Sequence, residues 1–194
     1  MKVLIACEFS GIVRDAFRDQ GHKAWSCDIL PTESNSKYHI QCDVLKILND
    51  GWDLMIAHPP CTFLSNSGVH WLHRDPSRWA KMNEAALFFK TLLESNINKI
   101  CIENPIMHRY AKEIIGQNQT QVVQPYMFGH DAKKATCLWL KNLEPLKPTN
   151  LIVKKRYSNQ TPSGQNNLGP SIDRWKLRSK TYEGIAQAMA EQWG

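Results

Sequence analysis

The first 140 residues alternate between short apolar runs and segments whose apolar residues recur at helical spacing. The short runs that predict strands span residues 2–7, 23–28, 39–43, 53–57 and 99–102. The runs at 2–7 and 53–57 are almost wholly apolar, as is typical of parallel strands covered on both faces. Helical spacing occurs at residues 12–20 and 75–94. Two more apolar runs, at 122–123 and 136–140, predict a closing hairpin around Gly129. This alternation predicts an α/β fold with an open, mostly parallel sheet and helices on both faces.

The pattern changes in the last quarter of the chain. Residues 144–178 are polar, basic and rich in proline, with little periodicity, and they predict a long functional loop. Residues 180–193 return to helical spacing and predict a final helix, whereas residues 66–74 are expected to form a polar loop. A chain of 194 residues can bury one sizeable core. We therefore expect a single domain over residues 1–194, with 144–178 as a loop insertion.

Composition narrows the class of protein. Hydrophobic residues make up 42% of the chain, but no apolar run approaches the roughly 18 residues that span a membrane. The apolar N-terminal run stops at Cys7 without a cleavage site, so it predicts a strand rather than a signal peptide, and we expect a cytoplasmic location. The six cysteines never form a Cys-x-x-Cys pair, which argues against a zinc site or a disulfide framework.

Positive charge is concentrated at the C-terminal end. The net charge is +6, and residues 141–194 hold 9 Lys and Arg against 4 Asp and Glu. This bias favours a polyanionic partner. A solvated surface that keeps the protein soluble is the alternative explanation.

Several polar residues follow the predicted strands directly. In a doubly wound sheet, ligands bind beyond the carboxyl ends of the strands. Gly11 would let the backbone approach a ligand there, Asp28 could accept hydrogen bonds from ribose hydroxyls, and Asp43 could hold an adenine amino group. These positions favour a nucleoside-type cofactor, although acids at strand ends are often only caps.

Three short motifs carry a resemblance to a known family. Phe9-Ser10-Gly11, Pro59-Pro60-Cys61 and Glu103-Asn104 occur in this order, each at the end of a predicted strand. They resemble the cofactor loop, nucleophile loop and glutamate loop of the S-adenosylmethionine-dependent cytosine-C5 DNA methyltransferases. The resemblance implies a Rossmann-like class I methyltransferase fold with a reduced target-recognition loop. It also implies S-adenosylmethionine as cofactor, DNA as partner with a flipped or single-stranded cytosine, and methyl transfer to C5.

The resemblance also implies roles for individual residues. Cys61 would add covalently to C6 of cytosine, and the two preceding prolines would hold it rigidly. Glu103, kept protonated by burial, would bind N3 and the exocyclic amine. Residues expected to bind the cofactor are Phe9, Ser10, Gly11, Asp28, Asp43 and Pro59. Residues expected to bind the substrate are Ser65, Asn104, Lys134, Tyr157 and Arg174, and Trp175 could either stack on a base or pin the loop to the core.

Each central residue has an alternative role. Cys61 could be an ordinary thiol, and Glu103 could be a helix cap ahead of Asn104. His58 stands where the family commonly has a small residue, and either a loop hydrogen bond or a chemical role is open to it.

The chain also departs from the family pattern. Thr62, Pro105 and Val13 stand where glutamine, valine and a second glycine are usual, and lysines at 133–134 replace arginines. Only about 40 residues lie between Leu140 and Lys180 for target recognition. We therefore keep two alternatives: the same chemistry on RNA or a free cytosine nucleotide, and an inactive nucleic-acid-binding or regulatory protein with the same fold.

Overall fold

A single seven-stranded sheet organises the computed structural model, which describes residues 1–194. Its strand order is β3-β2-β1-β4-β5-β7-β6, in which only β7 runs antiparallel to its neighbours β5 and β6. The strands are β1 (Lys2–Ala6), β2 (Lys23–Asp28), β3 (His39–Gln41), β4 (Leu54–Ala57), β5 (Lys99–Asn104), β6 (Gln121–Val123) and β7 (Thr136–Lys141). The predicted α/β fold with an open, mostly parallel sheet is therefore confirmed, and the predicted closing hairpin is the β6–β7 pair.

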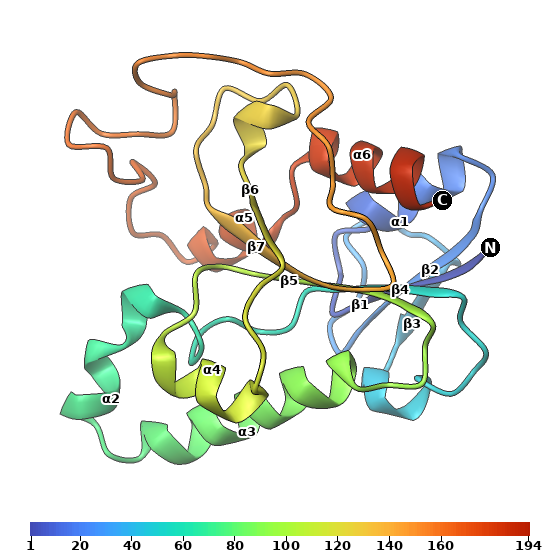
Figure 1. Ribbon diagram of the computed structural model, residues 1–194, viewed down its shortest axis with the longest axis horizontal. Coiled ribbons are helices and arrows are strands. Elements are labelled where there is room, and N and C mark those ends of the chain that lie inside the picture. The colour runs from blue at the N-terminus through green and yellow to red at the C-terminus, as the bar shows by residue number, and fades with distance from the viewer.

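Helices cover both faces of this sheet (Figure 1). The α-helices are α1 (Ile12–Asp19), α2 (His70–Arg74), α3 (Arg78–Leu93), α4 (Arg109–Ile115), α5 (Arg174–Ser179) and α6 (Glu183–Trp193). Short 3-10 helices are η1 (Val44–Lys46), η2 (Asn66–Gly68) and η3 (Pro125–Met127). Helices α1 and α6 lie on one face, and α3 and α4 on the other (Figure 1). None of the helices combines the length and apolar character needed to cross a membrane.

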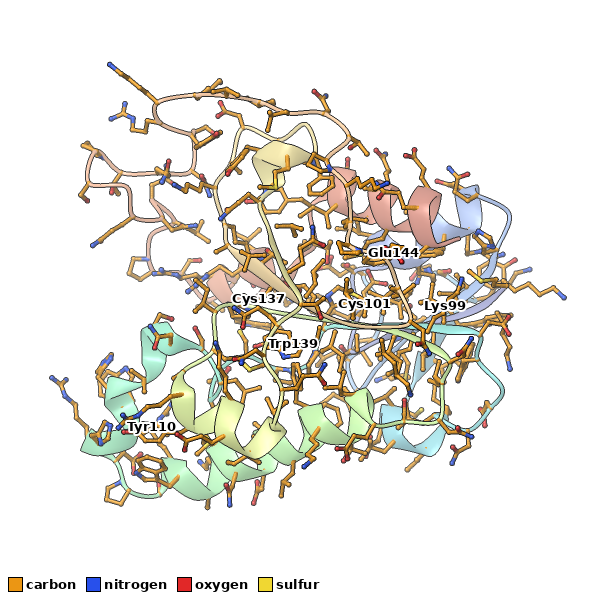
Figure 2. All side chains as sticks on the ribbon, in the orientation of Figure 1. Lys99, Cys101, Tyr110, Cys137, Trp139 and Glu144 are labelled. Atoms are coloured by element: carbon orange, nitrogen blue, oxygen red, sulfur yellow. The ribbon has the colours of Figure 1, made fainter.

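Two apolar cores lie on opposite sides of the sheet, because successive strand residues point to opposite faces. In β1, Leu4 joins the core beneath α3 and α4, whereas Ile5 joins the core beneath α1 and α6. Trp139 of β7 lies on the α3 side, with its ring centroid 5.0 Å from that of Phe89 (Figure 2). The near-continuous apolar strands are thus explained by burial on both faces.

Three short helices differ from the sequence predictions. Helix α2 lies within the predicted loop 66–74, α5 lies within the predicted loop 144–178, and α4 was not predicted. Helix α2 buries only Leu72 and α5 buries no residue, so neither shows an apolar stripe in the sequence. Helix α3 begins three residues later than expected, because the Asp75 carboxylate accepts hydrogen bonds from the backbone N–H and hydroxyl of Ser77 and forms a turn there.

Candidate functional site

The carboxyl ends of five parallel strands share one edge of the sheet. Strands β3, β2, β1, β4 and β5 are parallel neighbours, so the loops that follow them emerge together. The direction in which the sheet grows along the chain reverses between β1 and β4. Strands β2 and β3 are added on one side of β1, and β4 and β5 are then added on its other side. A crevice at such a switch point is the usual ligand site of an open α/β sheet.

The loop after β1 turns sharply into α1. Cys7 and Gly11 both have positive φ values, 57° and 80°. The buried Glu8 carboxylate accepts hydrogen bonds from the backbone N–H groups of Val13 (2.8 Å) and Arg14 (3.3 Å). Burial raises the pKa of Glu8, and these hydrogen bonds and the charge of nearby His58 only partly oppose that rise. Sequence reasoning missed Glu8, although an acid just ahead of a helix is a recognisable N-terminal signal.

Both of the acids predicted to bind the cofactor cap local turns. Asp28 Oδ1 accepts from the backbone N–H of Leu30 at 2.9 Å, and Asp43 Oδ1 accepts from that of Leu45 at 3.0 Å. Burial raises the pKa of the Cys7 thiol, and the charges of Asp28, Cys27 and Asp43 raise it further. Both acids are therefore close enough to act on Cys7. The two carboxyl groups therefore face one neighbourhood at the ends of β2 and β3.

Asn104 ties the nucleophile loop to β5. Its buried amide donates from Nδ2 to the carbonyl of Pro59 at 2.9 Å, and its Oδ1 is buried without a hydrogen-bond partner. The Cys61 carbonyl accepts from the backbone N–H groups of Leu64 and Ser65, both at 3.0 Å, so a tight turn follows the thiol. Asn104 thus lies behind the loop and fixes it. The Ser65 hydroxyl is engaged with that of Ser67 at 2.9 Å.

Cys61 is the one exposed cysteine among the six. Partial burial of its sulfur raises the pKa of the thiol, and the Glu103 carboxylate raises it further. The charges of Lys134 and Arg178 act in the opposite direction. Lys134 also donates from Nζ to the Arg178 carbonyl at 2.8 Å, which ties the end of α5 to the segment before β7. The structure thus brings Cys61, Glu103 and Lys134 within electrostatic range of one another.

Glu103 forms a close pair with His58. His58 Nδ1 lies 3.0 Å from Glu103 Oε2, and both side chains are mostly buried. Burial acts to raise the pKa of Glu103, but the hydrogen bond from His58 and the charges of Lys134 and His58 outweigh it and lower that pKa. The prediction that burial keeps Glu103 protonated is therefore wrong for the free protein, where the carboxyl is ionised at neutral pH.

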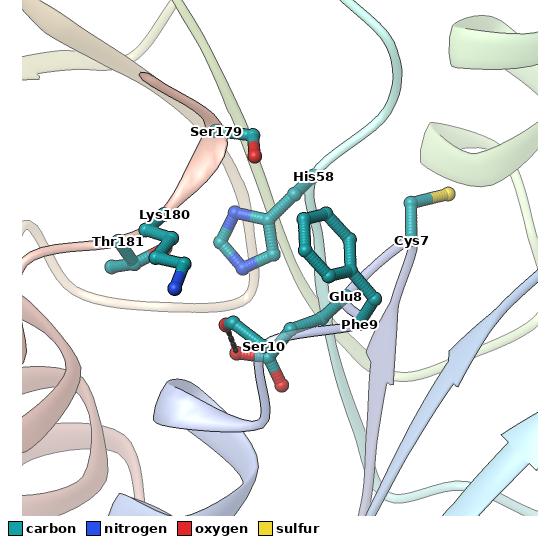
Figure 3. A pocket seen from close by; sticks show the side chains of 8 residues that line it. All are labelled: Cys7, Glu8, Phe9, Ser10, His58, Ser179, Lys180 and Thr181. Atoms are coloured by element: carbon teal, nitrogen blue, oxygen red, sulfur yellow. Dashed lines mark hydrogen bonds between the residues drawn. The ribbon is translucent and has the colours of Figure 1, made fainter. Parts of the chain in front are cut away.

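A small polar cavity lies between the β1 loop and the segment that follows α5. It has a volume of about 40 Å³, enough for a few water molecules. Figure 3 shows the His58 ring between the side chains of residues 179–181 and those of residues 8–10. The Phe9 ring, which also lines the cavity, lies 5.9 Å from that of Trp175, so α5 covers the predicted cofactor loop.

A second, basic pocket lies away from this edge, over the predicted loop insertion. It has a volume of about 380 Å³, and its lining includes Lys133, Lys154, Lys155 and Arg156. Tyr157 also lines it, but this residue is buried, its ring stacks on Tyr126 with centroids 4.9 Å apart, and its hydroxyl donates to the Ile152 carbonyl. In this arrangement Tyr157 stiffens the pocket wall and has no free face for a base. Arg174 is half-buried on α5, outside this pocket.

No group of three or more His, Cys, Asp or Glu side chains is arranged to hold a metal ion. Neither a family model nor a curated protein sequence matches this chain.

Proposed function

We propose that this chain transfers a methyl group from S-adenosylmethionine to C5 of cytosine in DNA, on a Rossmann-like class I methyltransferase fold. One observation carries the proposal: Cys61 and Glu103 come from neighbouring strand ends and lie within electrostatic range of each other. Addition to C6 requires that a nucleophilic thiol and a carboxyl group of the protein contact the same pyrimidine ring.

In the proposed reaction, the sulfur of Cys61 bonds to C6 and negative charge develops in the ring toward N3. Lys134 and Arg178 favour the thiolate, because their charges lower the pKa that burial and Glu103 raise. A proton held at Glu103 would stabilise N3 and would select cytosine over uracil, whose N3 already carries a hydrogen. A water molecule or another base takes up the proton on C5, and the electron pair of that C–H bond restores the ring double bond as the bond between Cys61 and C6 breaks.

Residues at the carboxyl ends of β2, β3 and β4 suit the cofactor by their chemistry. Asp28 and Asp43 offer acceptors for ribose and adenine groups. The His58 ring lines the small cavity, and its buried Nε2 has no hydrogen-bond partner. When bound, S-adenosylmethionine would supply an electrophilic methyl group. The 40 Å³ cavity does not hold a nucleoside, so the proposal requires residues 174–181 to move outward when the cofactor binds.

Label transfer from tritiated S-adenosylmethionine tests this proposal. Duplex DNA, single-stranded DNA, RNA and a cytosine nucleotide are offered separately, and we expect label at cytosine C5 of DNA. Cys61→Ala should abolish it, while Cys101→Ala, the same change at a buried thiol, should retain it. Protein that binds the cofactor but labels none of the four substrates would refute the proposal.

An inactive nucleic-acid-binding protein is the second candidate. The observation in its favour is the raised pKa of Cys61, which leaves the thiol mostly protonated at neutral pH. This candidate expects binding of DNA through the basic pocket without any label transfer. Label in RNA or free nucleotide alone would instead support the same chemistry on those substrates.

A further inference from the structure

His58 lies between two carboxyl groups that come from different strands. Its Nδ1 pairs with Glu103 at the end of β5, and its charge also acts on Glu8, which follows β1. Because β1, β4 and β5 are neighbours in the sheet, the three side chains form a row along its edge. The row leads from the predicted cofactor loop to the predicted base-binding carboxyl.

The second nitrogen of His58 has no partner. The His58 side chain is 8% exposed, and its Nε2 is buried without a hydrogen bond. This nitrogen belongs to a ring that lines the small cavity, together with Glu8, Ser10 and Lys180 (Figure 3). A buried polar atom without a partner is costly, so its position requires an explanation.

The pairing with Glu103 determines where the His58 proton lies. An ionised carboxylate only accepts hydrogen bonds, so Nδ1 must carry a hydrogen. Nε2 is then free to take up or release a second proton through water in the cavity. Imidazole is the side chain whose charge changes most readily near neutral pH, which suits it to this task.

The proposed reaction needs a proton where the free protein has none. Glu103 is ionised before the base binds, yet charge develops at N3 when Cys61 adds. We propose that His58 is a positioning residue that carries the proton Glu103 must present to the bound base. This inference rests on the proposed function.

The proton transfer balances in both directions. The N–H bond at His58 Nδ1 breaks as an O–H bond forms on Glu103, and that proton moves to N3 as the sulfur of Cys61 bonds to C6. Nε2 exchanges protons with water in the cavity. When the sulfur–carbon bond breaks, the proton returns through Glu103 to Nδ1, so the relay consumes no proton.

The charged groups around His58 come from three parts of the chain. Glu8 lies in the β1 loop and Glu103 in β5. Lys180 lines the same cavity after α5, but its charge is paired with Glu33 at 2.7 Å. The relay works only while His58 holds its second proton.

His58→Gln separates proton carrying from simple hydrogen bonding. Glutamine can donate a hydrogen bond to Glu103 but cannot carry a proton. We expect kcat for methyl transfer to fall about a hundredfold, with little change in KM for the cofactor. His73→Gln, at an exposed histidine, should keep the wild-type rate.

The outcomes distinguish this inference from the function on which it rests. If the wild type transfers the methyl group and His58→Gln does so with unchanged kcat, the relay is overturned and the methyltransferase proposal stands. An absence of transfer in the wild type would overturn both. Nitrogen-15 spectra of the imidazole give a readout without turnover: a proton on Nδ1 that responds to Glu103→Gln is expected, and a bare Nδ1 would contradict the relay.

Discussion

Gly11 lies where a side chain would strike a buried guanidinium. A Cβ at this position would fall 2.7 Å from Cζ of Arg14 and would also overlap its Nη2. Arg14 is fully buried and holds Asp15 through two hydrogen bonds, at 2.8 and 2.9 Å, and the hydroxyl of Ser26 at 3.0 Å. Gly11→Ala must displace this network in addition to adopting a positive φ.

The cost can be separated into two parts. The left-handed backbone at Gly11, with φ of 80°, costs alanine about 1–2 kcal/mol. Forcing the extra methyl against the packed guanidinium adds about 1–3 kcal/mol. Gly51 has a similar φ of 74° but open space around its Cβ position, so Gly51→Ala should cost only the first part.

Urea unfolding of the two variants and the wild type measures both parts. We expect Gly11→Ala to lose about 2–5 kcal/mol of unfolding free energy and Gly51→Ala about 1–2 kcal/mol, with similar m-values. Equal losses in the two variants would show that the Arg14 network yields without cost, and would refute the reasoning.

Three further predictions concern the site. Cys61, as the exposed thiol, should be alkylated first at neutral pH, as mass spectrometry of timed samples can show. Glu103→Gln should speed this reaction because the neighbouring carboxylate raises the pKa of the thiol, and slower alkylation of Cys61 in this variant would contradict the reasoning. The folded-state pKa of Glu103 lies below its ordinary value of 4.5, so its stabilising contribution is complete above that value and is lost as the pH falls through the folded pKa. Glu103→Gln should accordingly be less stable than the wild type at neutral pH and approach it in acid, and a pH-independent difference in urea unfolding would contradict this. Asn104→Ala should cost about 1–3 kcal/mol because it leaves the buried Pro59 carbonyl without its donor, whereas Asn66→Ala, at an exposed amide, should cost little in the same unfolding measurement.

The parallel part of the sheet was predictable from the sequence. Residues such as Val3 to Ala6 in β1 are all buried, so their unbroken apolar run reflects the cover on both faces. Helix α4 was missed because it is short and its N-cap is His108, which accepts from the backbone N–H of Ala111 and is not among the common capping residues. Helix α5 buries nothing and therefore leaves no apolar pattern.

The positions of Cys61 and Glu103 were predictable, but their electrostatics were not. The strand ends place Cys61 and Glu103 at one edge, as their motifs suggest. The ionisation of Glu103 depends on His58 and Lys134, which come from other parts of the chain, and no local pattern couples residues 45 positions apart. Tyr157 illustrates the same limit, because its burial against Tyr126 follows from how the loop folds back.

The proposed covalent step can be trapped directly. In DNA with 5-fluorocytosine at the target position, the fluorine on C5 cannot leave as a proton does, so the bond between sulfur and C6 persists after methyl transfer. We expect intact-mass and peptide spectra to show the DNA attached to Cys61, only in the presence of S-adenosylmethionine, and absent from Cys61→Ala. Attachment to a different residue, or no attachment by protein that has bound both ligands, would contradict a nucleophilic role for Cys61.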